Sequence, residues 1–267
     1  MGDMLLAIDI GNSNITLGGI QEGEILFEAR LATDATKTSD EYGVEIKDML
    51  DLFGARVEEI RDCIVASVVP PVFNSVRNGI VKLTGKEPMV VGPGIKTGIN
   101  ILLEDPGATG ADLIAAAVAA VDTYPTPLTV VDMGTATTIA VIDDGNAFLG
   151  GAVLPGLRIS AEALSSRASL LPGIQLERPR RAIGKNTVEC IQSGLMFGAA
   201  AMVDGLIDRM EAELGRPTTV VATGGVARFV VPLCRHEIAL ERDLQLKGLD
   251  LLYRKNRPRK EAAPDPR

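Results

Sequence analysis

The chain has little of what nucleic-acid-binding proteins need. Tryptophan is absent, and aromatic residues make up 3% of the 267 residues, which leaves few rings on which single-stranded bases could stack. The net charge of −8 is opposite in sign to the basic surface that binds a phosphate backbone. Both features argue against a nucleic-acid partner, and the negative charge fits a soluble enzyme.

Cysteine and histidine are scarce as well. Cys63, Cys190 and Cys234 are too few and too widely spaced for a disulfide framework. Each lies in an apolar or helical stretch, so we interpret all three as reduced core side chains. The single histidine, His236, matches no motif, and we expect it to be structural or on the surface.

Long hydrophobic runs are also missing. The longest alanine-rich apolar run, residues 113–121, has nine residues and is too short to span a bilayer. The N-terminal stretch MGDMLLAIDI lacks the basic region of a secretory signal peptide. Position 6 is leucine, which does not suit myristoylation. We therefore expect a cytoplasmic protein with no membrane partner.

What the chain does contain is a pair of similar polar loops. DIGNSN, at residues 9–14, and DMGTATT, at residues 132–138, each lie between two apolar runs. Aligning the loops pairs four positions: Asp9 with Asp132, Gly11 with Gly134, Ser13 with Ala136, and Asn14 with Thr137. The repeat favours two similar halves, and the 46% of hydrophobic residues is ample for their cores.

The expected secondary structure begins in the same way in both halves. Each loop joins two short apolar runs into a hairpin, and a third extended run follows. In the first half, the runs are residues 4–10, 15–20 and 24–33, followed by a helix at 38–53, a strand at 62–71 and a helix at 74–85. In the second half, the runs are residues 127–134, 137–145 and 146–156, followed by helices at 159–168 and 188–214 and a strand at 217–225. Thr38 with Glu41, and Asn186 with Glu189, have the spacing that caps a helix N-terminus.

Both loops have the composition of phosphate-binding turns. Glycines let a backbone turn tightly and present its N–H groups to an anion. A carboxylate at the strand end would repel phosphate unless a cation such as hydrated Mg²⁺ lies beside it. Either loop alone could be only a turn, but the pairing and a third Gly-rich strand end at Thr223-Gly224-Gly225 favour a polyphosphate site. Neither a Walker A sequence nor GxGxxG is present.

A set of short motifs then gives a specific family resemblance. In order along the chain they are DIGNSN, KTSDEYG, SVVPP, VGPGIKTG, TGAD, VDMGTATT, GGAVLPG, GKNTVECIQSG and ATGG. From residue 4 to about residue 254 the sequence resembles type III pantothenate kinase, a member of the acetate/sugar kinase, Hsp70 and actin superfamily. Any single motif is weak, but the ordered set is specific.

The resemblance implies an α/β fold of two duplicated ribonuclease-H-like halves, of the actin-like ATPase type, with mixed five-stranded sheets around an ATP cleft. We place these halves at residues 1–120 and 121–254, and we expect the charged, proline-bearing tail at 255–267 to be disordered. Family members are homodimers with the substrate pocket at the interface. Gly194 and Gly198, four residues apart on the long expected helix, mark a candidate contact.

The resemblance also implies an activity and a set of site residues. The family transfers a phosphoryl group from ATP to the primary hydroxyl of pantothenate, giving 4′-phosphopantothenate in the first step of coenzyme A biosynthesis. The residues implied for ATP and its phosphates are Asp9, Gly11, Asn12, Ser13, Asn14, Gly134, Thr135, Gly224 and Gly225. Asp9 would also organise Mg²⁺, through water, and Asp132 would hold a monovalent cation, K⁺ or NH₄⁺. The positions implied for the acceptor are Leu103, Gly110, Ala111, Leu113 and Thr187.

Asp112, in TGAD, matches the catalytic base of the family. A carboxylate suits this role, because phosphoryl transfer needs a group that accepts the proton of the attacking hydroxyl. From the residues alone, Asp112 could merely cap the apolar helix that follows it. The two roles can coexist.

Three departures from the family pattern surround the acceptor. Leu113 stands where the family has arginine, Leu103 where it has tyrosine, and Ala116 where an asparagine is common. Losing one charge-assisted hydrogen bond of about 1.5–3 kcal/mol would weaken acceptor binding roughly ten- to a hundred-fold. Three hypotheses follow: a pantothenate kinase with a rebuilt pocket, a divergent kinase with another hydroxyl acceptor, or a nucleotide-binding regulatory protein that has lost turnover. The retained Asp112 favours a kinase, and the three departures favour the regulator.

Overall fold

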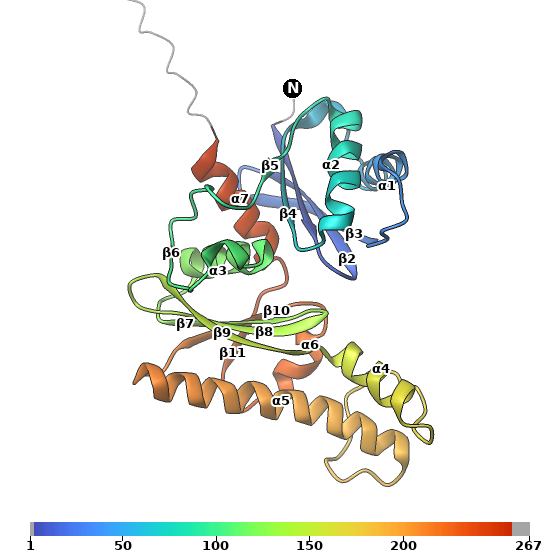
Figure 1. Ribbon diagram of the computed structural model, residues 1–267, viewed down its shortest axis with the longest axis vertical. Helices are drawn as coiled ribbons and strands as arrows, with labels where there is room; N and C mark the ends of the chain where they lie inside the picture. The colour runs from blue at the N-terminus through green and yellow to red at the C-terminus, as the bar shows by residue number, and fades with distance from the viewer. Residues whose placement is uncertain (1–2, 258–267) are drawn as a thin grey trace, which may run out of the picture. The chain divides into compact units, whose positions relative to one another are not determined.

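The structure, a computed structural model, describes residues 3–257 and divides into two compact units (Figure 1). Unit 1 comprises the chain up to Gly98 and again from Leu246 on, and unit 2 is Ile99–Gln245. These boundaries differ from those of the predicted halves, 1–120 and 121–254. Helix α3 (Ala111–Thr123) belongs to unit 2, and helix α7 (Leu244–Asn256) carries the chain back into unit 1.

The predicted tail at 255–267 begins too early. Lys255 and Asn256 are the last residues of α7, and the Asn256 side chain bonds the backbone of Lys96, accepting from its N–H at 2.8 Å and donating to its carbonyl at 2.9 Å. Residues 258–267 lie outside the described residues. The helix therefore continues two residues into the segment that the charged composition had assigned to disorder.

Unit 1 is built on a mixed five-stranded sheet with the order β3-β2-β1-β4-β5. Its strands are β1 (Met4–Ile10), β2 (Asn14–Gln21), β3 (Glu24–Ala32), β4 (Ile60–Ser67) and β5 (Met89–Val90). The first three form an antiparallel meander, as the hairpin pattern predicted, and β4 and β5 run parallel to β1. The first polar loop thus lies at the turn between β1 and β2.

Two helices, α1 (Ser39–Leu52) and α2 (Pro70–Thr84), pack side by side against this sheet (Figure 1). The predicted capping box is confirmed, because the Thr38 hydroxyl accepts from the Glu41 N–H and the Glu41 carboxylate accepts from the Thr38 N–H. The helices approach closely at Gly43 and Gly79. A Cβ on Gly79 would lie 2.8 Å from the Ser39 carbonyl oxygen, so a larger residue there would force the helices apart.

Unit 2 has six strands in the order β11-β10-β7-β8-β9-β6, one more than predicted. They are β6 (Asn100–Ile101), β7 (Leu128–Met133), β8 (Ala136–Ile142), β9 (Ala147–Pro155), β10 (Thr219–Thr223) and β11 (Ile238–Leu240). β7, β8 and β9 form an antiparallel meander, and β10 and β11 run parallel to β7. Five of the six strands therefore follow the same order and directions as the sheet of unit 1, and the short β6 adds an outer edge beside β9.

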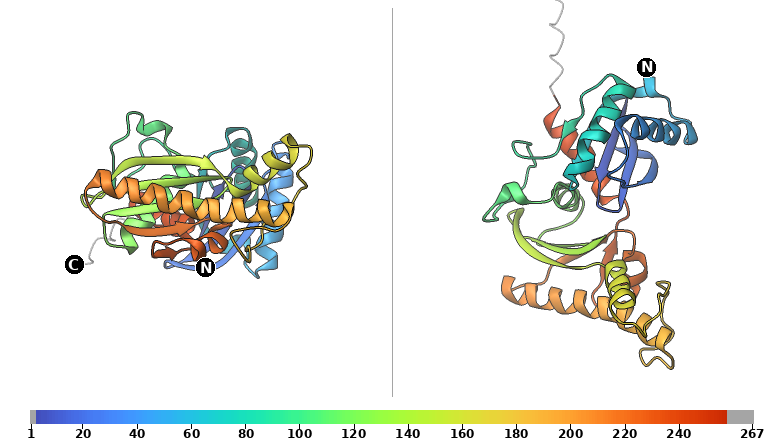
Figure 2. Two further views of the ribbon diagram at one scale, coloured as in Figure 1. Left: turned by 90° about the horizontal axis from the view of Figure 1, so that it is seen from below. Right: turned by 45° about the vertical axis from the view of Figure 1, so that its right-hand side comes forward.

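Helices cover both faces of the unit 2 sheet (Figure 1). α3 packs on β7 and β8, while the long α5 (Thr187–Leu214) runs along the opposite face (Figure 2), together with α4 (Leu157–Arg167) and α6 (Ala227–Val230). Alternate residues of β7 therefore face opposite ways. Val131 and Met133 join the core with α5, and Asp132, between them, faces the side of α3.

Helix α5 is, among the described residues, the one helix long and apolar enough to cross a membrane. Buried side chains such as Met196 and Ile207 pack in the core of unit 2, as in a core helix of a globular protein. Its N-terminus is capped by Asn186, whose side-chain oxygen accepts from the Glu189 N–H at 2.9 Å, as predicted.

The cysteines only partly follow the expectation of core side chains. Cys63 is buried, but Cys190 is exposed near the start of α5 and Cys234 is half-buried. All three are free. Burial raises the pKa of the Cys63 and Cys234 thiols to about 12, which keeps both protonated and unreactive at neutral pH.

Candidate active site

The first polar loop is an open turn at the edge of unit 1. Asp9 is the penultimate residue of β1, and Gly11 closes the turn by donating its N–H to the Asn14 carbonyl at 3.0 Å. The Thr33 hydroxyl donates to the Gly11 carbonyl at 2.7 Å, which holds the loop against the end of β3. The exposed members are Asn12, Ser13 and Asn14. The loop therefore offers short hydroxyl and amide side chains to a ligand.

The second polar loop, in unit 2, is tighter. Gly134 donates its N–H to the Ala136 carbonyl at 3.0 Å, so that only Gly134 and Thr135 separate β7 from β8. Gly156, after β9, lies directly under the turn. A Cβ on Gly156 would overlap the Thr135 carbonyl oxygen and lie 2.7 Å from the Gly134 carbonyl oxygen. The position of this loop is therefore fixed by close backbone packing.

Asp132 lies at the base of this loop and is half-buried. Its Oδ2 accepts a hydrogen bond from Gln245 Nε2 at 2.8 Å, and Gln245 Oε1 accepts from the buried Thr223 hydroxyl at 3.4 Å. Gly224, with a φ of +97°, packs so closely that a Cβ there would lie 2.7 Å from Asp132 Oδ1. Burial, and next the charge of Asp112, raise the pKa of Asp132 to about 7 despite the hydrogen bond from Gln245.

Asp112 is the second residue of α3 and lies near enough to Asp132 for the two charges to repel. Its Oδ1 accepts from the Leu113 N–H at 2.8 Å. Burial raises the pKa of Asp112 above its ordinary value, and backbone hydrogen bonds only partly offset that shift. The helix N-cap is Gly110, which makes no side-chain cap. Asp112 is thus a carboxylate with a raised pKa beside a second carboxylate, an arrangement typical of functional sites.

The structure brings some of the predicted acceptor residues together. Gly110, Ala111 and Leu113 flank Asp112 at the start of α3, and Ala116 is buried one turn further along. Leu103 packs over β9, with its Cδ2 3.5 Å from the position of a Cβ on Gly150.

Thr187 does not join this group. It is the exposed first residue of α5, which lies on the opposite face of the sheet from α3 (Figure 1). Within one chain, the sheet therefore separates Thr187 from Asp112.

Sequence reasoning missed two side chains at Asp132. Gln245 is 113 residues away in sequence and lies in no recognised motif. Thr138 is the cross-strand partner of Asp132, and its hydroxyl oxygen is buried without a hydrogen-bond partner. The alternation of polar residues in DMGTATT could have indicated Thr138, but the register that pairs it with Asp132 depends on the length of the turn.

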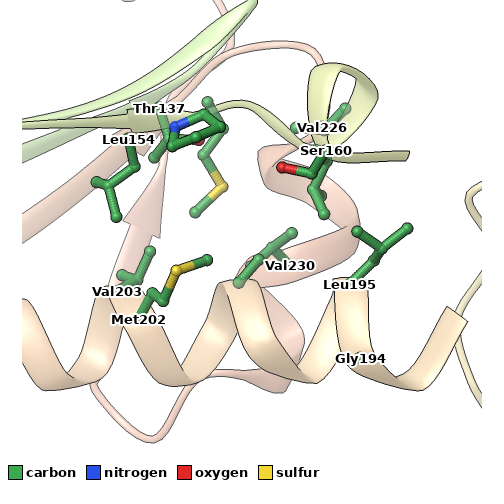
Figure 3. Close-up of a pocket in the computed structure, with 13 residues that line it drawn as sticks. Thr137, Leu154, Ser160, Gly194, Leu195, Met202, Val203, Val226 and Val230 are labelled. Carbon is green, nitrogen blue, oxygen red and sulfur yellow. The ribbon is translucent and has the colours of Figure 1, made fainter. Parts of the chain in front are cut away.

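A cavity of about 70 Å³ lies on the other face of the same strands (Figure 3). Its walls are mainly apolar and include Met133, Leu154, Leu195, Met202 and Val226. Thr137 also lines it, which shows that Thr137 and Thr138 face opposite sides of the sheet. The cavity is thus separated from Asp112 and Asp132 by the sheet.

Solved structures of low sequence identity share this fold. A Campylobacter jejuni protein named as a Baf family transcriptional activator matches with 18% identity and a TM-score of 0.60, over 94% of this chain and 98% of that one. Component A of the (R)-2-hydroxyglutaryl-CoA dehydratase of Acidaminococcus fermentans matches with 17% identity and a TM-score of 0.54, over 93% and 95%. A ROK hexokinase from Thermus thermophilus matches with 15% identity and a TM-score of 0.50, over 93% and 98%. At these identities the likeness shows the fold alone.

The family is shown by sequence. The family model of type III pantothenate kinase matches residues 5–209, which include both polar loops, the segment around Asp112 and most of α5. The chain belongs to the type III pantothenate kinase family.

Proposed function

We propose that the protein phosphorylates the primary hydroxyl of pantothenate with ATP, the first step of coenzyme A biosynthesis. The observation that carries the proposal is Asp112, a half-buried carboxylate with a raised pKa, at the position of the family's base and beside a second carboxylate, Asp132. A raised pKa makes a carboxylate a stronger proton acceptor once it is ionised.

Each group of site residues has its own role in phosphoryl transfer. Asp112 accepts the proton of the acceptor hydroxyl as its oxygen attacks the γ-phosphorus of ATP. The turn formed by Gly134 and Thr135, and the side chains of Asn12 and Ser13, hold the phosphates of ATP. Gly224 and Gly225 flank the adenosine. The reaction is mostly positioning and charge neutralisation, so the close packing under the second loop has a direct use.

Two cations belong to this proposal, and the residues present fit them. Mg²⁺ and a monovalent cation would supply positive charge that neutralises the phosphates. Asp9 at the first loop, acting through water, suits Mg²⁺, which keeps several of its waters. Asp132, a carboxylate close enough to Asp112 for their charges to interact, supplies oxygen donors that suit K⁺ or NH₄⁺.

A duplicated architecture and a homodimer are also part of the proposal. The shared order of five strands in the two sheets supports duplicated ribonuclease-H-like halves. Because the sheet separates Thr187 from Asp112 within one chain, one acceptor touching both residues would lie between two copies. The family and the composition support a cytoplasmic location.

The residues near the acceptor position bear on which compound is phosphorylated. Leu103 and Leu113 present alkyl side chains where the family has tyrosine and arginine. A divergent kinase with another hydroxyl acceptor is therefore the second candidate, and a nucleotide-binding protein without turnover is the third.

The test is ADP release from ATP in the presence of Mg²⁺ and K⁺, measured with saturating pantothenate, with other hydroxyl compounds and without acceptor. We expect pantothenate-dependent ADP from the wild-type protein. ADP release that depends on a different acceptor would identify the second candidate. ATP binding with no acceptor-dependent ADP would contradict both kinase hypotheses.

A further inference from the structure

Thr138 lies opposite Asp132 on the same face of the sheet. The β7–β8 register pairs Asp132 with Thr138 and Met133 with Thr137, and directly opposed residues of an antiparallel pair point to the same side. Met133 and Thr137 line the cavity on the α5 side. Asp132 and Thr138 therefore point together to the side of α3, which carries Asp112.

The hydroxyl of Thr138 has no hydrogen-bond partner, although it is buried. Its Oγ1 is one of the few such side-chain atoms among the described residues. A buried hydroxyl without a partner is unfavourable, and such an atom in a native structure calls for a ligand or another explanation. In contrast, the oxygens of Asp132 are held in place: Gln245 donates to Oδ2, and Oδ1 lies against Gly224.

These atoms form an oxygen-rich site of negative charge. Asp132 and Asp112 supply carboxylates, and Thr138 supplies a neutral oxygen that can direct a lone pair to a cation. None of the groups that shift the pKa of either carboxylate is a lysine or arginine. The missing partner of the Thr138 hydroxyl could be a cation or a further hydrogen-bond acceptor. A cation without a strict coordination geometry suits these carboxylate and hydroxyl oxygens better.

We infer that Thr138 is a ligand of the monovalent cation and, with Asp132, holds that ion at the base of the second polar loop. The inference rests on the proposed function for the presence of a cation at Asp132, and it adds a residue to which no role has been assigned. It also explains why a threonine hydroxyl is left without a partner beside a carboxylate in a closely packed part of unit 2.

The test compares Thr138→Val with Thr137→Val. Valine has the shape of threonine without its hydroxyl, and Thr137 is the next residue of the same strand but faces the cavity. Thermal unfolding of each protein is followed during a K⁺ titration without ATP, at constant ionic strength set with tetramethylammonium. This readout does not depend on turnover.

We expect K⁺ to stabilise the wild-type protein and Thr137→Val with the same half-maximal concentration. Thr138→Val should need roughly tenfold more K⁺, which corresponds to the loss of about 1.4 kcal/mol of binding, and Thr138→Ser should restore the wild-type value. Should Thr138→Val fail to fold, Thr138→Ser and Thr138→Ala provide the same comparison.

Three results would overturn the inference: no stabilisation of the wild-type protein by K⁺, equal K⁺ dependence of Thr138→Val and wild type, or an equal loss in Thr137→Val. The outcome is separable from that of the proposed function. Stabilisation by K⁺ that requires Thr138, in a protein without turnover, would support the inference while the proposed function fails. Acceptor-dependent ADP release, together with an unchanged K⁺ midpoint in Thr138→Val, would support the proposed function and contradict the inference.

Discussion

The two polar loops begin with a similar sequence motif, but they differ in length and in exposure. The loop of unit 1 has three residues between its strands, Gly11 to Ser13, and the loop of unit 2 has two, Gly134 and Thr135. The first exposes its polar side chains, whereas the second is packed against Gly156 from below. Under the proposed function, the first loop would contribute side chains to ligand binding, and the second would contribute backbone in a fixed position.

The difference of one residue also corrects the sequence alignment of the loops. Gly11 bonds Asn14, and Gly134 bonds Ala136, so Asn14 corresponds to Ala136 and not to Thr137. Beyond the turn, Asp9 is paired with Thr16 and Asp132 with Thr138. Both hairpins therefore place a threonine opposite the aspartate, a likeness that the ungapped alignment hides.

The largest expected effect concerns Asp132, the half-buried carboxylate at the base of the second loop. Because the pKa of Asp132 is about 7 in the folded protein and the ordinary pKa of an aspartate is 3.8, the folded protein holds this proton more tightly than the unfolded chain does. Its contribution to stability is fully present below pH 4 and is lost as the pH rises to 7. At about 1.4 kcal/mol per pKa unit, the loss approaches roughly 4 kcal/mol.

Asp132→Asn has no such titration. Measured by urea unfolding without K⁺, the difference in unfolding free energy between variant and wild type should shift in favour of the variant between pH 4 and 7. A difference that stays constant over this range would show that Asp132 is ionised in the folded protein throughout. Adding K⁺ should reduce the shift, because the cation favours the ionised carboxylate.

The next effect tests the close packing around the second loop. Gly224→Ala places a Cβ at a φ of +97° and 2.5 Å from the Met133 carbonyl oxygen. Backbone strain and overlap should together cost about 3 kcal/mol in unfolding free energy, measured by urea denaturation.

Two matched changes serve as controls for Gly224→Ala. Gly173→Ala, also in unit 2, meets nothing within 4 Å and should be nearly neutral. Gly11→Ala, in the more open first loop, meets only the Asn14 carbonyl oxygen at 3.1 Å and should cost less than Gly224→Ala. Equal costs at Gly11 and Gly224 would contradict the contrast between the loops.

The smallest effect is expected in the first loop. Asn12→Ala removes an exposed amide. It should leave the unfolding free energy within about 0.5 kcal/mol of wild type and weaken ATP binding, measured by calorimetry, about three- to tenfold, the effect of one hydrogen bond. An unchanged affinity for ATP would show that the Asn12 side chain does not bind the nucleotide.

The sequence predicted the local features of the fold well because they depend on neighbouring residues. Both hairpins, the capping box at Thr38 and the cap at Asn186 follow from short patterns and are present. The domain boundary depends on which sheet a helix packs against. No local pattern in residues 111–123 indicates that α3 packs on β7 and β8. Likewise, no local pattern indicates that α7 returns to unit 1.

In the candidate site too, local sequence motifs were predictable and long-range contacts were not. Motifs indicated Asp112 and Asp132, and the structure adds that burial raises the pKa of both carboxylates. Gln245 could not be foreseen, because it reaches Asp132 from the far end of unit 2 in sequence. Thr138 could not be paired with Asp132 before the length of the turn was known, because a shift of one residue turns every side chain to the other face.

The most direct test of the whole account is transfer of the labelled γ-phosphoryl group of ATP to pantothenate, comparing the wild-type protein with Asp112→Asn. If Asp112 is the base, the wild type should form labelled phosphopantothenate, and the variant should be slower by about 10²- to 10⁴-fold while still binding ATP. Equal rates of transfer by the two proteins, or no labelled product from ATP-bound wild type, would contradict it.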